Sequence, residues 1–375
     1  MKPRELLFES KLCGTCMKMC RHVCPTGQMT IKNEGTYPWS RGLVAFATRS
    51  KFLDLGKSEV EKLYQCATCK LCYTWCKPEV ELDLIVEDLR ADAVSQCPDC
   101  IPGNVMQLAR DYERTKNLLG EDPEGRMNQI DPSLLQPTPG APVGYFIGCV
   151  TAYRTPEIAN AILRVLNSQG IEYQVLGNEE NCCGGPLVRA GHRDLAQQVA
   201  EANVTQFQER GIETLIMGCP GCLHAFGIDY KKLFKLEGVP AAVHVLDFLR
   251  TRGYKPEATL PASVTFHDPC HYARHFKEPS WFEVPREVLR EMGADLHEMT
   301  WHHANAQCCG AGGSLRASYP DVAMQIGERR IREALETGAE YLVSTCPLCK
   351  QHLVEAAQRV PEAKQLHIAD LFELL

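Results

Sequence analysis

The chain has 375 residues, 45% of them hydrophobic, and its 40 Lys and Arg against 47 Asp and Glu give a net charge of −7. This acidic balance argues against a sequence-general nucleic-acid binder, and no run approaches the ~18 apolar residues of a membrane span, although docking on a membrane partner stays open. The N-terminal stretch MKPRELLFESKLC lacks the features of a signal peptide. Twenty cysteines without an export signal favour metal binding in the cytoplasm over a disulfide framework.

Eight of the cysteines lie in two runs near the N-terminus. Residues 66–78, CATCKLCYTWCKP, have the spacing of bacterial ferredoxins, and residues 13–25, CGTCMKMCRHVCP, have one extra residue before the third cysteine. In two-cluster ferredoxins the fourth cysteine of each run binds the other cluster. This predicts two cubane [4Fe–4S] clusters, one on Cys13, Cys16, Cys20 and Cys76 and one on Cys66, Cys69, Cys72 and Cys24. The alternative is structural zinc, but zinc has no use for the third cysteine of either run.

Helices are predicted on both sides of the second run. Residues 36–56 suggest a proline-started turn and an amphipathic helix, and residues 81–96 suggest a second helix. Cys97-Pro-Asp-Cys100 follows and is left over once eight ligands are assigned. We interpret this pair as thiols without a ligand role at a helix end. The alternatives are a redox-active pair of cysteines and half of a metal site that other residues of the chain complete.

From about residue 141 the chain repeats itself. Each copy contains a single cysteine, then Cys-Cys-Gly, then Cys-x2-Cys. The first copy uses Cys149, Cys182, Cys183, Cys219 and Cys222, and the second uses Cys270, Cys308, Cys309, Cys346 and Cys349. Each copy also ends alike, with VHVLDFL at 243–249 and LHIADLF at 366–372.

Short apolar runs precede the cysteines of both copies. The stretches 144–148, 214–218, 263–267 and 341–345 are predicted as buried strands. Residues 156–170, 194–211 and 321–338 have apolar residues at helical spacing and a glycine at the exit. Strands alternating with helices predict parallel α/β structure, in which ligands bind beyond the carboxyl ends of the strands.

The number of thiols in each copy exceeds what a cubane cluster needs. Each copy supplies five, and a cubane takes four. The fifth thiolate suggests a cluster with a bridging thiolate or an opened iron corner. Glycines allow positive φ and a close approach of the backbone to the ligand, so that a tight turn can aim two adjacent thiols at one body. These glycines are Gly184, Gly185, Gly310, Gly312 and Gly313.

These motifs resemble the cysteine-rich "CCG" family, whose best-understood members are heterodisulfide reductase subunits. The layout is also similar to the iron–sulfur subunits of glycolate oxidase and anaerobic glycerol-3-phosphate dehydrogenase, including the Ser40-Arg41-Gly42 segment. The resemblance implies that each copy holds a noncubane [4Fe–4S] cluster on its five cysteines. It also implies that a substrate disulfide is cleaved between the two clusters. The Cys97–Cys100 pair and the longer first loop depart from the family pattern.

Histidines near the cysteines are candidates for proton delivery. His271 follows Cys270 in the second copy only, and it is the predicted catalytic residue, with hydrogen bonding to backbone as the alternative. His302 and His303 are weaker candidates. His244 and His367 occupy similar places in both copies and are predicted to be structural. The charged stretch 327–336 is predicted to be a solvated helix face.

The sequence thus predicts an α+β multidomain chain. We expect a helical two-cluster ferredoxin-like domain (1–115), a linker (116–141) and a pseudo-twofold pair of parallel α/β CCG repeats (142–258 and 259–375). No dinucleotide fingerprint is present, so we expect neither flavin nor NAD on this chain and a flavoprotein or other electron-transfer subunit as partner. The predicted function is that of an oxidoreductase subunit with two-electron, disulfide-type chemistry on a small molecule. The alternative is a non-catalytic electron-transfer subunit that links a flavin-dependent 2-hydroxy-acid or glycerol-3-phosphate dehydrogenase to quinone.

Overall fold

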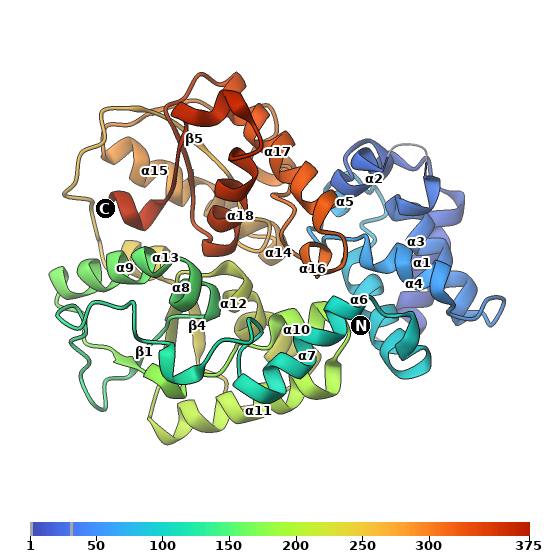
Figure 1. Ribbon diagram of the computed structural model, residues 1–375, viewed down its shortest axis with the longest axis horizontal. Coiled ribbons are helices and arrows are strands. Elements are labelled where there is room, and N and C mark those ends of the chain that lie inside the picture. Colours follow the sequence, from blue (N-terminus) through green and yellow to red (C-terminus); the bar gives the residue numbers. More distant parts are fainter. Residues whose placement is uncertain (1–2, 31–32) are drawn as a thin grey trace.

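The computed structural model describes residues 3–30 and 33–375. A helical N-terminal part lies at one end of the molecule, and two α/β repeats lie beside each other at the other end (Figure 1). The predicted combination of helices with parallel sheets is confirmed. The ferredoxin-like character of the N-terminal part and the domain boundaries stay proposals.

The N-terminal part is built from helices. Its α-helices are α1 (Pro3–Thr15), α2 (Pro25–Met29), α3 (Pro38–Arg49), α4 (Lys57–Tyr64), α5 (Leu71–Thr74), α6 (Leu82–Gln96) and α7 (Gly103–Thr115). The two predicted helices are confirmed as α3 and α6. Helix α3 begins with Pro38, at a position where a missing N–H breaks no helical bond. Helix α6 contacts α3, α4 and α10, so its apolar side chains form the centre of this part.

Each repeat contains one parallel four-stranded sheet, with the order β2-β1-β3-β4 in the first repeat and β6-β5-β7-β8 in the second. The strands are β1 (Val143–Phe146), β2 (Gln174–Val175), β3 (Thr214–Met217), β4 (Ala241–His244), β5 (Ser263–Phe266), β6 (Asp295–Leu296), β7 (Tyr341–Ser344) and β8 (His367–Asp370). The four predicted strands are the central β1, β3, β5 and β7, which are almost wholly buried. The strand order reverses beside β1 and β5, so their carboxyl ends open the crevice in which α/β sheets bind ligands.

Helices connect the strands and cover the sheets. They are α8 (Cys149–Arg154), α9 (Pro156–Ser168), α10 (Gly185–Ala190), α11 (Arg193–Glu209), α12 (Pro220–His224) and α13 (Val245–Arg250) in the first repeat, and α14 (Ala273–Phe276), α15 (Glu283–Glu291), α16 (Leu315–Ser318), α17 (Pro320–Glu336) and α18 (Pro347–Ala357) in the second. The three helices predicted in the repeats are confirmed as α9, α11 and α17. Each is followed by a glycine with positive φ, the residue that most easily ends a helix in the left-handed region. The repeats differ after their last cysteine, where a π-helix, η6 (Ala225–Leu233), replaces the regular turns of α18.

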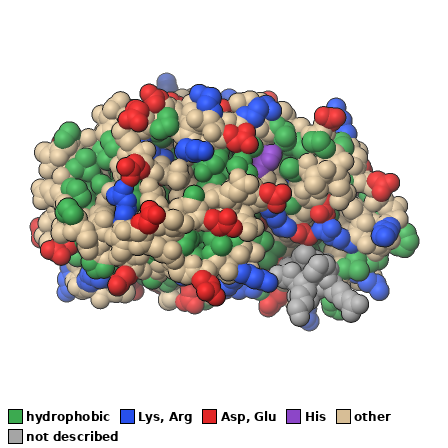
Figure 2. All heavy atoms as spheres, turned by 90° about the horizontal axis from the view of Figure 1, so that it is seen from below, with side chains coloured by type: hydrophobic (Ala, Val, Ile, Leu, Met, Phe, Trp, Pro, Cys, Tyr) green, Lys and Arg blue, Asp and Glu red, His purple; other side chains and the backbone are tan. Residues whose placement is uncertain are grey.

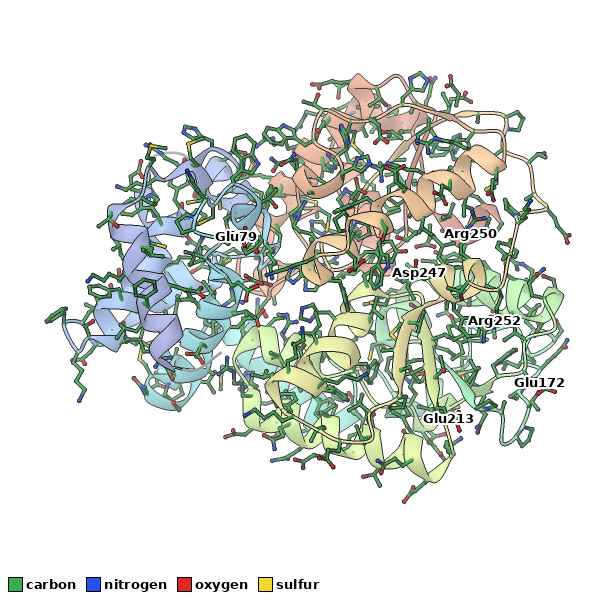
Figure 3. The ribbon with its side chains drawn as sticks, turned by 180° about the vertical axis from the view of Figure 1, so that it is seen from behind. Glu79, Glu172, Glu213, Asp247, Arg250 and Arg252 are labelled. Carbon is green, nitrogen blue, oxygen red and sulfur yellow. A yellow bond between two sulfur atoms is a disulfide. The ribbon has the colours of Figure 1, made fainter. Side chains whose placement is uncertain are left out.

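The two repeats pack against each other through one continuous core. Apolar side chains of α9 and α13 join those of α15 and β5 in a single buried cluster. Polar contacts cross the same boundary, because the Tyr272 hydroxyl donates to Asp247 at 2.7 Å and Arg250 pairs with Glu291 at 2.7 Å. Asp247 and Arg250 lie on α13 between the repeats (Figure 3). The repeats are therefore held against each other by both apolar and polar contacts.

The predicted equivalence of His244 and His367 is wrong by three residues. His244 is the last residue of β4, and the last residue of β8 is Asp370. The side chains of His244 and Asp370 each cap the helical turn that follows their strand. Each accepts a hydrogen bond from the backbone N–H of the residue two positions later. Burial lowers the pKa of His244 to about 4, in keeping with a structural role. His367 is instead the first residue of β8, where it is exposed and stacks on Tyr341.

Residues 116–141, predicted as a linker, pack onto the first repeat. Arg126 is 1% exposed, and Ile130 belongs to the core that the two repeats share. The chain enters β1 directly from this packed segment. The segment therefore contributes to the first repeat instead of spanning open solvent.

The surface carries charges of both signs. Acidic and basic side chains are interspersed on the face drawn in Figure 2, in line with the modest net charge of −7. Among the described helices, none combines the length and the apolar character that crossing a bilayer requires.

The contact between Asp247 and Tyr272 predicts a pH dependence of stability. Burial raises the pKa of Asp247 to about 6, and the Tyr272 hydrogen bond only partly opposes this. A carboxyl group whose pKa is raised on folding stabilises the fold fully below its unfolded pKa, and this stability is lost as the pH rises through about 6. We expect the denaturation midpoint of Asp247→Asn to fall less between pH 4 and about pH 7 than that of the wild type. Parallel pH profiles for the two proteins would contradict this assignment.

Candidate functional site

The cysteines predicted as ligands are all free thiols, and the structure gathers them in four groups. We name them N1 (Cys13, Cys16, Cys20 and Cys76), N2 (Cys24, Cys66, Cys69 and Cys72), R1 (Cys149, Cys182, Cys183, Cys219 and Cys222) and R2 (Cys270, Cys308, Cys309, Cys346 and Cys349). N1 and N2 lie in the N-terminal part, R1 in the first repeat and R2 in the second.

Group N2 lines a cavity between the two N-terminal cysteine runs. All four thiols of the group border it, together with Arg41 and Asp83. Cys24 comes from the first run and the other three from the second, which is the crossing that ferredoxin spacing predicts. Thr68 and Lys70 adopt left-handed backbone conformations that fold the loop tightly around the thiols. Four thiols around one cavity match the donor set of a cubane cluster.

Group N1 brings together thiols that oppose each other's ionisation. Burial, followed by Cys20, Cys16 and Cys76, raises the pKa of Cys13 to about 12. Neighbouring thiolates at this spacing stay ionised together only when a cation compensates their charge. Gly42 of α3 makes room for the group, because a Cβ there would lie 2.4 Å from the Cys13 sulfur. The glycine of the Ser-Arg-Gly segment is therefore required by packing.

The five thiols of R1 form one continuous string at the carboxyl edge of the first sheet. Cys149 neighbours Cys182, Cys182 neighbours Cys183, Cys183 neighbours Cys222 and Cys222 neighbours Cys219, because one thiol of each pair shifts the pKa of the other. Cys149 begins α8 just after β1, and Cys219 caps α12 just after β3. The hydrogen bonds from Cys182 and Cys222 hold the pKa of Cys183 well below its usual range. The adjacent pair thus occupies the middle of a five-thiol arrangement.

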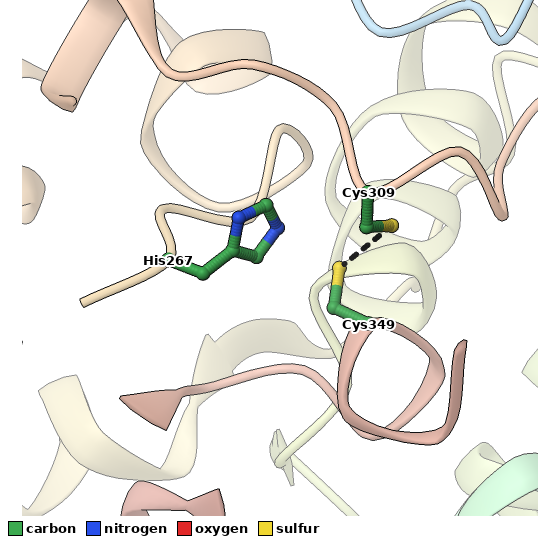
Figure 4. Close-up of side chains that lie close together, drawn as sticks. All are labelled: His267, Cys309 and Cys349. Carbon is green, nitrogen blue, oxygen red and sulfur yellow. Dashed lines mark hydrogen bonds between the residues drawn. The ribbon is translucent and has the colours of Figure 1, made fainter. Parts of the chain in front are cut away.

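Group R2 repeats this string in the second sheet. Cys270, Cys308, Cys309, Cys349 and Cys346 are neighbours in that order, and a hydrogen bond of 3.4 Å joins the sulfurs of Cys309 and Cys349. His267 lies beside them, and its donor atoms and the two sulfurs are all within 4.8 Å of one another (Figure 4). Arg330 donates to His267 Nδ1 at 3.1 Å, so the ring proton is on Nε2. Hydrogen bonds from Cys308, Cys349 and His267 keep the pKa of Cys309 well below its usual range.

A buried ion pair supports R1 in place of this histidine. Arg126 pairs with Glu180 at 2.7 Å, and its guanidinium lies 3.6 Å from the Cys149 sulfur. Glu180 also accepts the backbone N–H groups of Ile147 and Gly148, the two residues before Cys149. The pair therefore fixes the loop that presents Cys149. Each repeat thus places a polar side chain beside its thiols, Arg126 in R1 and His267 in R2.

Two contacts join the cysteine groups to one another. The thiol of Cys69, in N2, is hydrogen-bonded to that of Cys308, in R2, and this bond followed by burial raises the pKa of Cys69. Cys219 of R1 lies near Cys346 of R2. The hydrogen bond with Cys349 lowers the pKa of Cys346, but burial and the Cys219 thiol produce a net increase. N2, R2 and R1 therefore form a continuous series.

The predicted catalytic residue His271 lies in a cluster of histidines where the three parts of the chain meet. Its Nδ1 is 3.2 Å from the Cys270 sulfur, and its ring stacks on His275 at 4.1 Å and meets His224 edge-on at 5.1 Å. Burial, and then His224 and Arg189, hold the pKa of His271 well below its usual range. The imidazole is therefore neutral near pH 7.

The glycines after the paired cysteines serve the backbone of the protein itself. Gly184 and Gly310 have φ values of 73° and 104°. A Cβ at Gly310 would lie 2.3 Å from the Ala323 carbonyl oxygen. The requirement for positive φ is confirmed at these two positions and at Gly313, while Gly185 and Gly312 have ordinary φ.

Cys97 and Cys100, interpreted from the sequence as thiols without a ligand role, are not free thiols. They form a disulfide between η3 (Pro98–Cys100) and the residue before it. Two neighbours of the thiols, His267 and Arg126, were also missed from the sequence, as was Glu180, which holds Arg126 in place. His267 was visible beside Cys270, but Arg126 and Glu180 lie far in sequence from Cys149, the cysteine whose loop they support, and no local pattern marks that role.

Comparison with known proteins identifies relatives. The cysteine-rich domain family CCG matches residues 143–227 and 264–354. The chain is 32% identical to the D subunit of dihydromethanophenazine:CoB–CoM heterodisulfide reductase from Methanosarcina acetivorans, over 92% of this chain and 87% of that one. It is 28% identical to the B subunit of fumarate reductase (CoM/CoB) from Methanothermobacter marburgensis, over 100% and 74%, and 26% identical to EtfAB:quinone oxidoreductase of Syntrophomonas wolfei, over 84% and 46%.

The close approach of Gly42 to Cys13 yields a test specific to N1. In Gly42→Ala the new methyl group collides with the Cys13 sulfur, so we expect iron content to fall by about four atoms per chain. Gly103→Ala, at the start of α7 with nothing within 4 Å, is the matched control. Iron analysis of anaerobically purified proteins measures the difference. Full iron content in Gly42→Ala would show that N1 does not hold a four-iron cluster.

Proposed function

The chain belongs to the cysteine-rich CCG domain family, which includes the heterodisulfide reductase D subunits, and on that premise we propose that it is an iron–sulfur oxidoreductase subunit. In this proposal N1 and N2 each hold a cubane [4Fe–4S] cluster, and R1 and R2 each hold a noncubane one. The chemistry is two-electron reduction of a small disulfide-type substrate. Electrons come from a partner flavoprotein or other electron-transfer subunit.

One observation carries the proposal. All ten cysteines of the two repeats are present, and the five thiols of each set lie close enough to shift the pKa values of their neighbours. A cubane site would leave the fifth thiol without a role. Complete sets in both repeats support two sites of the same kind facing each other through Cys219 and Cys346.

The contacts and the burial of the thiols indicate how clusters bound in these groups would work. Clusters bound there would supply one-electron transfer, and the disulfide, two electrons and two protons would yield two thiols. The contact between Cys69 and Cys308 places N2 against R2, while burial of most thiols of R1 and R2 excludes water. Cys149, Cys219 and Cys270 are only half-buried, which leaves these sulfurs accessible to a small molecule.

The loop of N1 exposes side chains that are suited to binding a partner protein. In the N1 loop Met17 is 87% exposed and Met19 is 40% exposed. Flexible methionine side chains adapt readily to a protein surface. We therefore place the electron-donating partner at the N1 loop, away from the repeats.

A second function is favoured by the similarity to EtfAB:quinone oxidoreductase. In that case the chain would pass electrons between a flavin-dependent dehydrogenase and quinone without a substrate of its own. Anaerobic isolation of the native complex distinguishes the two proposals. A co-purifying flavin-dependent dehydrogenase that reduces this chain with a hydroxy acid would favour the second.

Substitution of the central cysteines tests the assignment of the four groups. Cys183→Ser and Cys309→Ser should each remove one noncubane electron paramagnetic resonance signal and leave the N1 and N2 signals intact. Wild-type protein should contain about sixteen irons, four for each of four clusters. Loss of the cubane-type signals in either variant would contradict the grouping, and zinc in place of iron would contradict the proposal as a whole.

The neutral state of His271 yields a prediction for its proposed catalytic role. We expect His271→Ala to lower disulfide reduction by a reduced viologen dye by about 100-fold or more, the usual contribution of a positioned proton-transfer group. Because its pKa is well below the usual range, we expect no step in wild-type turnover near pH 6.5 from this residue. His367→Ala, on an exposed strand start, is the control. Unchanged turnover in His271→Ala would remove the residue from the mechanism.

A further inference from the structure

A second set of metal-binding side chains lies outside the cysteine groups. Glu298, His302 and His303 each offer a donor atom, and these atoms all lie within 4.8 Å of one another. The two histidine Nδ1 atoms face each other at 2.5 Å. Glu298 and His303 are 28% and 30% exposed, so solvent reaches the set. No cysteine belongs to it.

The protonation of His303 is set by Glu283. The carboxylate of Glu283 lies 2.6 Å from His303 Nε2, so this nitrogen carries the proton and donates it. The Nδ1 lone pair of His303 therefore points toward His302. A carboxylate that accepts the distal N–H of a histidine is the usual outer partner of a metal-binding imidazole, because it fixes the tautomer and raises ligand basicity. The hydrogen bond between the two Nδ1 atoms then has its proton on His302, and a cation can take the place of this proton once His302 carries its proton on Nε2 instead.

The carboxylate ligand is positioned in the same way. Arg286 donates to both oxygens of Glu298, at 2.6 and 2.9 Å, and is itself held by Asp268. Asp268 also accepts the backbone N–H of His303 at 2.8 Å. His303 has a φ of 54°, a left-handed conformation that is costly for a residue other than glycine and is often found where a side chain must be aimed at a ligand.

The balance of charge permits a cation. Asp268, Glu283 and Glu298 contribute three negative charges, and Arg286 and Arg290 contribute two positive ones. Both histidines are neutral when they act as ligands. A divalent ion would therefore enter a site of net negative charge.

The first repeat lacks this arrangement. The pairings of β1 with β3 and of β5 with β7 align Val143 with Val264, so that Leu296 corresponds to Tyr173 and Glu298 to Val175. Val175 is half-buried and packs against the apolar core that the two repeats share. The set is thus a feature of the second repeat and not part of the duplicated cysteine motif.

We propose that Glu298, His302 and His303 bind one divalent ion of the zinc type, with a further coordination position open to solvent. Two imidazoles and one carboxylate are a donor set that suits such an ion and leaves room for a water molecule. The ion connects the exit of β6 to η8 (His303–Asn305), in the segment that leads to Cys308. It thereby holds in place the loop that carries the paired cysteines of R2.

Zinc uptake by the anaerobically purified, iron-loaded protein tests the proposal. Equilibrium dialysis against Zn²⁺ followed by elemental analysis should show about one zinc per chain beyond the iron. His302→Ala should weaken uptake at least tenfold, and Glu283→Gln should weaken it about 10- to 100-fold through the lost outer partner. His297→Ala is the matched control, because His297 is exposed and bonds to Asp295 outside the set.

X-ray absorption at the zinc edge then identifies the ligands. We expect nitrogen and oxygen neighbours at about 2.0–2.2 Å with two imidazoles. Sulfur at about 2.3 Å would place the zinc in a cysteine group and overturn the proposal. The absence of zinc uptake, or uptake unchanged in His302→Ala at equal iron content, would overturn it as well. The absorption spectrum needs only the wild-type protein, so the test holds even if a variant folds poorly.

Discussion

The structure depends on one buried guanidinium, that of Arg90 on α6. It is 0% exposed and donates to the backbone carbonyls of Leu63, Cys66, Arg189 and Gly313 at 2.6 to 2.8 Å. Burying a charge is costly unless its hydrogen-bonding groups are paired, so these four carbonyls must meet at one point. They come from the N-terminal part and from both repeats. Arg90 thereby fixes the N2 loop relative to the paired-cysteine loops of the two repeats.

Close backbone contacts surround this point. Gly313 has a φ of 60°, and a Cβ there would lie 2.3 Å from the Ala67 carbonyl carbon, in the N2 loop. Gly191 has a φ of 93°, and a Cβ there would lie 2.5 Å from the Arg90 carbonyl oxygen. Gly313, expected from the sequence to let the backbone approach a ligand, instead allows two parts of the protein to touch. Arg274 and His275 of α14 complete the junction by donating to the carbonyls of Cys69 and Thr68. The short contact between Cys69 and Cys308 is a consequence of this packing.

The two repeats share a fold but differ in their surroundings. R2 contacts the N-terminal part directly and has His267 beside its thiols. R1 has the buried Arg126–Glu180 pair, and burying such a pair is tolerated only because both charges find further hydrogen bonds. The Glu298 set lies in the second repeat, and the histidine cluster joins His271 and His275 of that repeat to His224 of the first. A duplicated cysteine motif has therefore been placed in two unequal environments.

The sequence by itself determined the local features. Cysteine spacing, the glycines at Gly184 and Gly310, the buried strands and the amphipathic helices could all be predicted, because they depend on residues close together in the chain. The crossing of Cys24 into N2 could also be predicted, from the ferredoxin spacing. Where prediction from the sequence failed, either the two repeats had been aligned incorrectly or the contacting residue lay far away in the chain. A three-residue shift in the last strand made His367 look like the counterpart of His244, a role that hydrogen-bond register gives to Asp370.

Only the tertiary structure decided how the groups meet. That Cys69 touches Cys308, that Arg126 reaches Cys149 and that Glu283 orients His303 all depend on segments brought together by packing. Such contacts join residues about 20 to 240 positions apart, and hydrophobic periodicity constrains which face of an element is buried but not which element covers it. The sequence therefore specifies the cysteine motifs, and the packing around Arg90 specifies how the groups of thiols lie against one another.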